Sequence, residues 1–528
     1  MERTAGELQT DRKSFVFQIA PAAAGVYLLA LLSFLILKPA GLFERDGYYH
    51  ARFANLLPSF GLSREFHWTQ ASTWRTQFCD KEFLFHVLMA PFATNTADPL
   101  SGVRYFSVLA SAAIFVLLFF ALRGQKTRWP VFFALLPLCM GGPFLMRAIM
   151  IRSHVLSISL LLIGMILLMK RKWKWLGALG FMYAWSYTIP FALVMTALPF
   201  TIGLWLIEKK FDWKLPAAAF AGVMAGLIIH PYSPLTLETF LTYVQVMRIG
   251  ADTSVTALEL GNEIYPLPWN DFLLQLPLYT LAFIAVWAGV WRLGKRCSSE
   301  ALGAACAALF WYAMSLHYGR FLEYGVPLTA LALGLCVRDL FRESILAASP
   351  ALLAASAVIC IGCHLQTVSQ TYKVAMDTPP DRFQGAAAWM SENLEPGETV
   401  ANVWWVEFPE LYYDGYRQNY LWGLDPTYTL RWNPDIAAAL EKMRIQRDIH
   451  PASLAKAFNA RVLIMGHMTA MDFPIFNRTD WEPVYADPYA VIFALSGPHG
   501  PAPDIGARVR AKPLRFFSSR SIKLKSDE

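Results

Sequence analysis

The stretch that decides the fold is KRKWKWLGALGFMYAWSYTIPFALVMTALPFTIGLWLIEKKFDWK, residues 170–214. Its centre, residues 175–207, carries no charged side chain, whereas Lys and Arg gather at both ends. A membrane-spanning helix needs about 20 apolar residues, so this run is too long for one crossing. Because basic residues mark the cytoplasmic side, both ends lie inside, and the run must cross twice with a turn near residues 186–190.

The same rule orders the other apolar runs. Runs near the length of a span cover residues 14–37, 105–122, 129–146, 153–169, 175–207, 215–237, 272–291, 301–319, 324–337 and 345–372. Basic clusters between them cover residues 12–13, 123–128, 170–174, 209–214, 292–296 and 338–342. With these clusters in the cytoplasm, the chain crosses about eleven times. The N-terminus is then cytoplasmic, and everything after residue 372 lies outside.

The composition predicts an α-helical polytopic membrane protein. Of the 528 residues, 55% are hydrophobic and only 16% are charged, a balance that is wrong for a soluble domain of this length. The first apolar run is too long for a signal peptide and is predicted to be a retained span. The formal charge of +7 comes from basic residues spread over loops and a tail. No nucleic-acid partner is therefore expected.

Three regions outside the spans are expected on the outer side. The membrane domain, residues 1–371, includes a first outer loop at 38–104 and a long outer loop at 233–271. Residues 372–496 are typical of an extracytoplasmic α/β domain, and the basic tail 497–528 is predicted to be disordered. The expected elements are helices at 80–91, 381–393 and 434–447, strands at 399–405 and 461–465, and a hairpin at 484–494.

Ionisable side chains collect at the outer ends of the predicted spans. Such groups are costly at membrane depth and are usually functional. They are Asp46, His50, Arg52, Arg147, Arg152, His154, His230, His317, Arg320 and Glu323. Inner ends carry mainly Lys and Arg, which the insertion rule already explains. The asymmetry predicts an outward-facing polar site, with Asp46, in the segment GLFERDGYYHARF of residues 41–53, as the catalytic candidate.

Simpler explanations exist for the same residues. Asp46 can be an ordinary carboxylate at the membrane surface. Guanidinium groups match phosphate geometry, but Arg147 and Arg152 would equally serve lipid head groups or a structural ion pair. Arg320 and Glu323 lie one helical turn apart and can pair with each other.

The absence of several known catalytic motifs argues against the mechanisms that need them. The sequence holds no Walker loop, no Gly-x-Ser-x-Gly elbow, no His-Glu-x-x-His and no paired-Cys metal motif. Hydrolysis by a serine triad or a zincin mechanism is therefore not expected. The His and Cys residues are also too scattered along the sequence to indicate a zinc site.

The order of these features resembles the GT-C superfamily of polyprenyl-phosphate-dependent glycosyltransferases. The shared features are an Asp shortly after the first span, a large first outer loop, many spans and an outer C-terminal domain that opens with Trp404-Trp405. The layout is similar to that of oligosaccharyltransferase catalytic subunits. The resemblance implies that Asp46 is a general base or metal ligand and that Arg320, assisted by His317, binds the donor phosphate.

The long outer loop gives one further match to oligosaccharyltransferases, and the sequence departs from them at two places. Glu259, with Glu263 beside it, sits where those enzymes have a loop acidic motif. Their second acidic motif would fall in residues 147–154, which contain no carboxylate. This argues against bound Mg²⁺ or Mn²⁺, for which Asp46 would be the ligand; Arg147 and Arg152, with His154, would instead neutralise the phosphate. The segment after Trp404-Trp405 differs, so sequon recognition is not implied.

The resemblance implies an inverting glycosyltransferase of the bacterial inner membrane, which moves a sugar from a polyprenyl-phosphate donor to an extracytoplasmic acceptor. An apolar groove, a cation for the leaving phosphate and a base for the acceptor proton fit that chemistry. The main alternative is a multi-pass transporter or lipid flippase, which predicts polar residues near the midplane and matching helix breaks. A third is a scaffold that presents the outer domain to a cell-envelope partner.

Overall fold

The computed structural model describes residues 5–96, 98–251, 265–344, 350–379, 382–446, 457–466 and 481–495. The chain divides into two compact units. The helical unit contains the described residues up to Leu62 and from Cys79 to Thr378. The mixed unit contains Ser63–Phe78 and the described residues from Pro379 onward.

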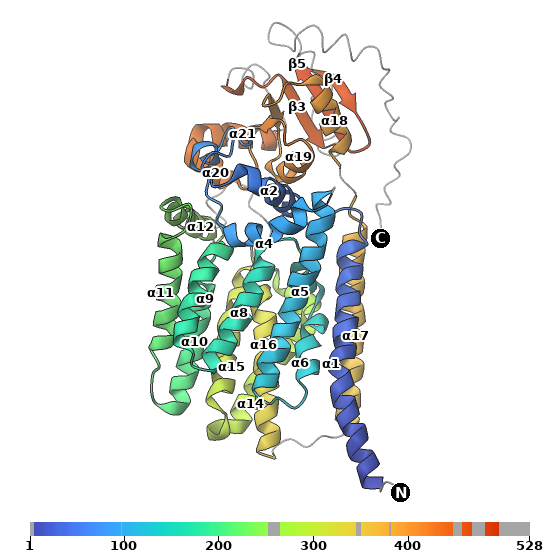
Figure 1. Ribbon diagram of the computed structural model, residues 1–528, viewed down its shortest axis with the longest axis vertical. Coiled ribbons are helices and arrows are strands. Elements are labelled where there is room, and N and C mark those ends of the chain that lie inside the picture. The colour runs from blue at the N-terminus through green and yellow to red at the C-terminus, as the bar shows by residue number, and fades with distance from the viewer. Residues whose placement is uncertain are drawn as a thin grey trace. The chain divides into compact units, whose positions relative to one another are not determined.

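Apolar helices build the helical unit (Figure 1). They are α1 (Ala5–Leu37), α2 (Asp46–Phe60), α4 (Phe83–Thr94), α5 (Pro99–Gly124), α6 (Pro130–Leu135), α7 (Gly142–Ala148), α8 (Ser153–Met169), α9 (Trp173–Ser186), α10 (Ala192–Glu208), α11 (Lys214–Ile228), α12 (Leu235–Ala251), α13 (Trp269–Gln275), α14 (Pro277–Leu293), α15 (Ser299–His317), α16 (Leu322–Arg342) and α17 (Pro350–Met376). Among the described residues, five helices are long and apolar enough to cross a membrane, or six if a bent pair is one span. These are features of a multi-pass membrane protein, and the number of about eleven spans stays a prediction.

The run 175–207 folds as two helices, as predicted. Helix α9 ends at Ser186 and α10 begins at Ala192, with Tyr187 in extended conformation between them. Pro190 contributes to the break because the residue before a proline is disfavoured in helical conformation. The two helices then pack against different neighbours, α9 mainly against α11 and α10 mainly against α15.

The predicted span at 129–146 is not one straight helix. Helix α6 passes through the 3₁₀ turn η1 (Leu136–Cys139) into α7, and the two parts meet at 104°. Pro137 lacks an amide hydrogen for the helix ladder, and Gly141 has a φ of +130°, which L side chains rarely adopt. Hydropathy indicated the apolar run but not the bend, because it does not register these two residues.

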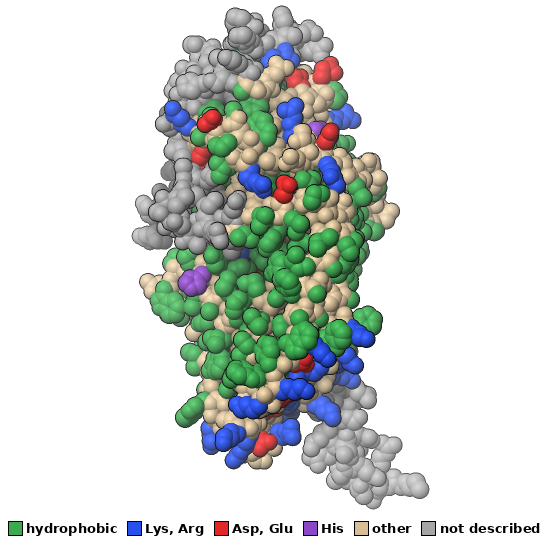
Figure 2. Space-filling model, turned by 90° about the vertical axis from the view of Figure 1, so that its left-hand side faces the viewer, with side chains coloured by type: hydrophobic (Ala, Val, Ile, Leu, Met, Phe, Trp, Pro, Cys, Tyr) green, Lys and Arg blue, Asp and Glu red, His purple; other side chains and the backbone are tan. Residues whose placement is uncertain are grey.

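The predicted inner loops gather at one end of the helical unit. Arg338, near the end of α16, donates to the carbonyl of Gln125 at the end of α5. Arg171, between α8 and α9, pairs with Glu208 at the end of α10. Figure 2 shows this end as a concentration of Lys and Arg below a broad apolar band. Helices α2 and α4 lie at the opposite end of the same unit (Figure 1).

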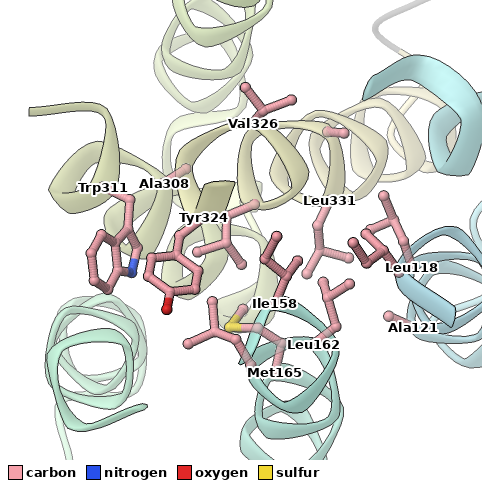
Figure 3. Close-up of a cluster of buried hydrophobic side chains, with 14 of the residues drawn as sticks. Leu118, Ala121, Ile158, Leu162, Met165, Ala308, Trp311, Tyr324, Val326 and Leu331 are labelled. Carbon is pink, nitrogen blue, oxygen red and sulfur yellow. The ribbon is translucent and has the colours of Figure 1, made fainter. Parts of the chain in front are cut away.

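Helix α16 forms the centre of the helical unit. Of its apolar window, 89% is buried, more than for any other candidate span among the described residues. Its Tyr324 and Leu331 face side chains of α5, α8 and α15, whereas Val326 points to the opposite side of the helix (Figure 3). The beginning of α16, which carries Glu323, is therefore fixed inside the bundle near the end that holds α2 and α4.

The mixed unit contains the predicted C-terminal sheet. Its strands are β1 (Thr399–Asn402), β2 (Asn419–Tyr420), β3 (Val462–Gly466), β4 (Trp481–Ala486) and β5 (Ala490–Leu495), in the order β2-β1-β3-β5-β4. Strands β2, β1 and β3 are parallel, and β3, β5 and β4 are antiparallel. Its helices are α3 (Trp74–Gln77), α18 (Gln384–Asn393), α19 (Phe408–Asp414), α20 (Pro426–Trp432) and α21 (Pro434–Gln446).

Part of the first outer loop belongs to this sheet. The amides of Gln70 and Ala71 donate to the carbonyls of Tyr420 and Leu421 at 2.8 and 2.7 Å. The indole of Trp68 donates to the carbonyl of Tyr416 at 2.6 Å. Residues 63–78 thus extend the edge at β2.

The Trp404-Trp405 segment serves the core of the mixed unit. Trp405 packs in its buried cluster beside Trp422 and Leu463. Glu407 is buried, and its carboxylate accepts from the amide of Gly466 at 3.1 Å. The tryptophans that carried the family resemblance are therefore explained by packing.

Substitution of Gly222 tests the contact between α9 and α11. A methyl group on Gly222 would overlap the backbone of Gly177, whereas one on Gly362 in α17 would meet nothing within 4 Å. We expect Gly222→Ala to cost ~1–3 kcal/mol through overpacking, and Gly362→Ala to be neutral or slightly stabilising. Thermal unfolding in detergent measures both. Equal unfolding midpoints would contradict the close packing of these helices.

Candidate active site

The start of α2 holds Asp46 beside two charged neighbours. The Glu44 carboxylate accepts from the amides of Asp46 and Gly47 at 3.0 and 3.2 Å, and so satisfies the free amides at the helix N-terminus. Arg152 lies 2.9 Å from Asp46 Oδ2 and 3.7 Å from Glu44. The Asp46 side chain keeps 30% of its surface exposed. It is therefore oriented by Arg152 and still open to solvent.

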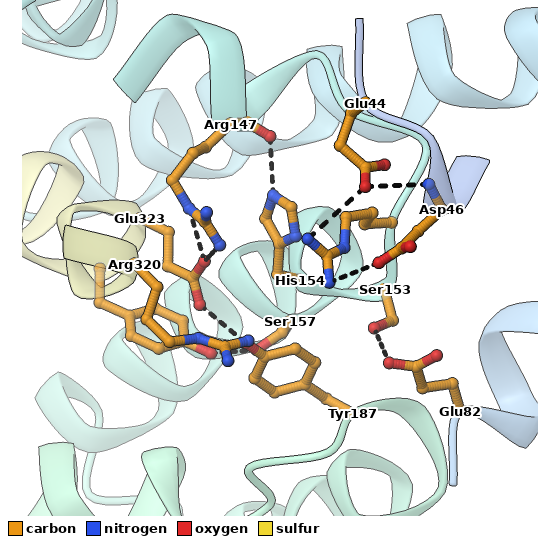
Figure 4. A network of polar contacts seen from close by, with 12 residues as sticks. Glu44, Asp46, Glu82, Arg147, Ser153, His154, Ser157, Tyr187, Arg320 and Glu323 are labelled. Atoms are coloured by element: carbon orange, nitrogen blue, oxygen red, sulfur yellow. Dashed lines mark hydrogen bonds and ion pairs between the residues drawn. The ribbon is translucent and has the colours of Figure 1, made fainter. Parts of the chain in front are cut away.

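A second network is deeply buried. The guanidinium of Arg147 in α7 donates twice to Glu323 Oε2, at 3.1 and 2.6 Å. Tyr187 donates to Glu323 Oε1 at 2.9 Å, and Arg320 donates to Tyr187 at 3.0 Å. The chain Arg147–Glu323–Tyr187–Arg320 joins α7, α16 and the turn between α9 and α10 (Figure 4). Arg320 also donates to Tyr243 in α12.

The two arginine-containing groups are connected through the first residues of α8. His154 Nε2 forms a hydrogen bond with the carbonyl of Arg147 at 2.8 Å. Ser153 donates to Glu82 at 2.6 Å, and Thr188 donates to the same carboxylate oxygen at 3.1 Å. Figure 4 shows the contacts of His154 with Arg147 and of Ser153 with Glu82. Arg152, which contacts Asp46, directly precedes Ser153 in the sequence.

The carboxylate of Glu82, just before α4, is held ionised. Burial raises its pKa, but the charges of His50, Lys81 and His86 and the hydrogen bond from Ser153 outweigh burial and lower the pKa to about 2. Burial also lowers the pKa of His50 well below its ordinary value, against the opposite effect of Glu82. Near neutral pH, Glu82 therefore carries its charge.

Formal charges separate across the site. Glu44, Asp46 and Arg152 contribute two carboxylates and one guanidinium, so that group is negative overall. Arg147, Glu323 and Arg320 contribute two guanidinium groups and one carboxylate, so that group is positive overall. A net negative group and a net positive group thus occur in the same region of polar contacts (Figure 4).

The positive end faces a pocket. Lys81 Nζ lies 5.6 Å and Arg320 Cζ 5.5 Å from the centre of the Tyr243 ring. The pocket lined by Lys81 and Tyr187 is otherwise mainly apolar and includes Leu227 and Phe240. Lys81 therefore places one cation at this small, mainly apolar pocket, and Arg320 reaches the same Tyr243 ring.

The structure brings some predicted site residues together and not others. Asp46 meets Arg152, while Arg147, His154 and Arg320 belong to the buried network. The side chain of His317 is exposed at the end of α15 and lies outside the interactions drawn in Figure 4. Glu259 and Glu263 lie outside the described residues.

Arg320 and Glu323, whose spacing offered a mutual ion pair as the simpler explanation, contact different partners. Arg320 belongs to the 3₁₀ turn η4 (Gly319–Phe321), and α16 begins only at Leu322. The one-turn spacing of an α-helix therefore does not apply, and Glu323 pairs with Arg147 instead.

Sequence reasoning also missed Lys81, Glu82 and Tyr187. Lys81 and Glu82 lie in the run Asp80-Lys-Glu before the amphipathic helix, and Tyr187 lies at the predicted break in residues 175–207. The charged run was the available signal for Lys81 and Glu82, and the predicted break was the available signal for Tyr187.

Comparison with solved structures identifies the fold. The apo oligosaccharyltransferase of Archaeoglobus fulgidus matches with a TM-score of 0.61 and 13% identity, over 84% of this chain and 69% of that chain. ArnT of Cupriavidus metallidurans bound to undecaprenyl phosphate matches with a TM-score of 0.56 and 13% identity, over 91% and 99%. The archaeal oligosaccharyltransferase AglB from Archaeoglobus fulgidus, in complex with an inhibitory peptide and a dolichol-phosphate, matches with 0.57 and 13%, over 85% and 70%.

These likenesses confirm the resemblance to GT-C glycosyltransferases at the level of fold. By sequence, no family model and no curated protein matches the chain. Activity and site roles therefore have to be argued from the residues of this chain.

Removal of one buried charge tests the Arg147–Glu323 pair. Glu323→Ala leaves a buried guanidinium unpaired, and we expect a loss of ~3–5 kcal/mol. Arg171→Ala breaks the partly exposed pair with Glu208 and should cost at most about 1 kcal/mol. Thermal unfolding of the purified variants compares them. The double change Arg147→Met with Glu323→Leu should recover most of the loss, and a Glu323→Ala protein as stable as Arg171→Ala would refute the assigned pairing.

Proposed function

We propose that this chain is an inverting membrane glycosyltransferase. It takes a sugar from a polyprenyl-phosphate donor and transfers it to an acceptor on the extracytoplasmic side of a bacterial inner membrane. The observation that carries the proposal is that a part-exposed carboxylate, Asp46, and a buried cationic centre at Arg320 belong to one region of polar contacts (Figure 4). The GT-C fold supports it, since two of the similar structures hold a dolichol-phosphate or undecaprenyl phosphate.

Asp46 acts as the general base. Arg152 holds one carboxylate oxygen at 2.9 Å, and the side chain remains 30% exposed. An exposed ion pair is worth only about 0–1 kcal/mol, so an acceptor hydroxyl or amide can reach the carboxylate at little cost. Asp46 takes the acceptor proton as the nucleophile attacks the anomeric carbon.

Arg320 and Lys81 bind the donor phosphate. Lys81 Nζ and Arg320 Cζ lie 5.6 and 5.5 Å from the centre of the Tyr243 ring. The prenyl chain would follow the apolar wall at Leu227 and Phe240. Arg147 is engaged with Glu323, so its role is to orient the network. The arginines at the site neutralise the phosphate as it leaves.

The reaction is a single in-line displacement. A bond forms between the acceptor atom and the anomeric carbon, while the bond from that carbon to the phosphate oxygen breaks. The electron pair of the broken bond leaves with the polyprenyl phosphate, and the proton of the acceptor goes to Asp46. Inversion at the anomeric carbon follows from one displacement.

The residues around Asp46 do not fit Mg²⁺ or Mn²⁺. A hard cation takes about six oxygen ligands, usually with several waters. Glu44 binds helix amides and Asp46 binds Arg152, and residues 147–154 add no carboxylate. Arg152 supplies a positive charge at Asp46, and no step is assigned to a metal there.

Binding of undecaprenyl phosphate tests the donor site without any sugar transfer. A lost hydrogen bond to a charged group costs about 1.5–3 kcal/mol, so we expect Arg320→Gln to weaken binding at least ~10-fold. Native mass spectrometry or thermophoresis in lipid nanodiscs measures the affinity. Lys295→Gln, at the other end of the helical unit, is the control, and undecaprenol without phosphate should not distinguish the variants. Unchanged affinity in Arg320→Gln would remove this residue from the donor site.

Substitution of the base tests the chemistry separately. We expect Asp46→Asn to lower transfer by about 10²–10⁴-fold and to leave binding of undecaprenyl phosphate unchanged. The wild-type chain is first incubated with a panel of polyprenyl-phosphate sugars and cell-envelope extract to find the sugar consumed. Glu65→Gln, which changes an exposed carboxylate of the mixed unit, should retain full transfer. Full transfer by Asp46→Asn would disprove its role as the base.

A further inference from the structure

Two histidines and a glutamate converge between α2 and α4. His50 Nδ1 lies 2.9 Å from His86 Nε2 and 3.9 Å from Glu82 Oε2. One ligand atom from each of the three residues lies within 4.8 Å of the others. His50 is 4% exposed and His86 is fully buried. This is a convergence of three strong metal-ligating groups outside the interactions assigned to sugar transfer.

Asp80 orients one of these ligands. His86 Nδ1 lies 2.9 Å from both oxygens of the Asp80 carboxylate. The Nδ1–H therefore donates to Asp80, and the lone pair of Nε2 points toward His50 and Glu82. A carboxylate that holds the far nitrogen of a histidine is the usual outer partner of a metal-binding imidazole.

Aromatic rings enclose the two imidazoles. Phe85 meets the His50 ring edge to face, and Tyr49 and Phe53 meet the His86 ring in the same way. An apolar shell limits water around a metal site and so strengthens its electrostatic interactions. It also keeps the rings from rotating away from one another.

We propose that His50, Glu82 and His86 bind one divalent transition-metal ion, with zinc as the favoured ion. Zinc bonds to histidine nitrogen are about 2.0–2.1 Å, so two such nitrogens in tetrahedral arrangement lie roughly 3.4 Å apart. The nitrogens here are 2.9 Å apart, and the Glu82 oxygen is 3.9 Å from His50. The ligand atoms of Glu82 and His86 lie within 4.8 Å of each other, so shifts of roughly 0.5 to 1.4 Å would complete the three bonds, leaving the fourth position to water.

The three ligand groups favour one class of metal ion. Two imidazoles and one carboxylate suit zinc, copper, nickel or cobalt, whereas magnesium and calcium prefer oxygen ligands. The bound ion would fasten α4 to α2. Since His50 follows Asp46 by one turn of α2, the ion would fix the helix that carries the proposed base. The proposal of a metal site does not depend on the proposed sugar transfer.

Metal content of the purified full-length chain tests the site. The protein carries no polyhistidine tag, is stripped with chelator, loaded with zinc sulfate in detergent and washed. We expect about one zinc ion per chain by mass spectrometry of the metal, and Co²⁺ loading should give the absorption of a tetrahedral N/O site. A wild-type chain that retains no zinc would overturn the proposal.

Variants of the ligands and their neighbours assign the ion to this site. Glu82→Gln keeps the shape of the side chain and should abolish the stoichiometric zinc, as should His86→Ala. Asp80→Asn should weaken zinc binding about 10–100-fold. His67→Ala changes an exposed histidine of the mixed unit and is the matched control. Thermal unfolding in detergent shows whether each variant is folded.

The outcomes separate a metal site from a hydrogen-bonded histidine pair. Loss of zinc in folded Glu82→Gln, with zinc retained in His67→Ala, supports the proposal. Equal zinc in wild type and Glu82→Gln would overturn it, because the ion would then lie elsewhere. Because metal content is measured without donor or acceptor, failure of the transfer assay does not affect this result.

Discussion

The site depends on the buried ion pair between Arg147 and Glu323. The two charges approach to 2.6 Å, and the Glu323 side chain is fully buried. Taking both charges out of water is expensive, so the pair persists only with close geometry and additional hydrogen bonds. Tyr187 supplies one of these bonds. The pair thereby ties α7, α16 and the turn after α9 into one arrangement.

The bend between α6 and α7 makes this pairing possible. A straight helix through residues 129–146 would carry Arg147 along the bundle axis, but the 104° bend turns α7 across it. Arg147 then meets Glu323 at the beginning of the central helix α16. Arg320, just before that helix, is drawn into the same network through Tyr187. A cationic centre results at the end of the unit that holds α2 and α4.

Hydropathy and charge were enough to predict most of the architecture. The break that divides residues 175–207 into two helices and the C-terminal strands follow from local patterns, and the structure has both. Local patterns could not reveal that residues 63–78 join the sheet edge at β2, because that pairing links Gln70 to Tyr420. The bend after Pro137 was missed for a different reason, since its residues are as apolar as those of a span.

The candidate site was predicted as a set of residues but not as a set of pairs. Outer-end charges were recognised because they are rare at membrane depth. Their partners depend on packing: Arg152 reaches Asp46 from another helix, and Glu323 pairs across 176 positions of sequence. His50 and His86 were dismissed as scattered because 36 positions separate them. Only the packing of α2 against α4 brings them together.

The two arginine–carboxylate pairs differ in their exposure to solvent. Arg147 and Glu323 are buried, so separating them would leave a charge in an apolar interior, and they act as framework. Arg152 and Asp46 are 22% and 30% exposed, and water can replace either partner. Under the proposed function, an acceptor would displace Arg152 from one oxygen of Asp46 without disturbing the bundle. The freed guanidinium would then be available to stabilise the negative charge that develops on a leaving phosphate.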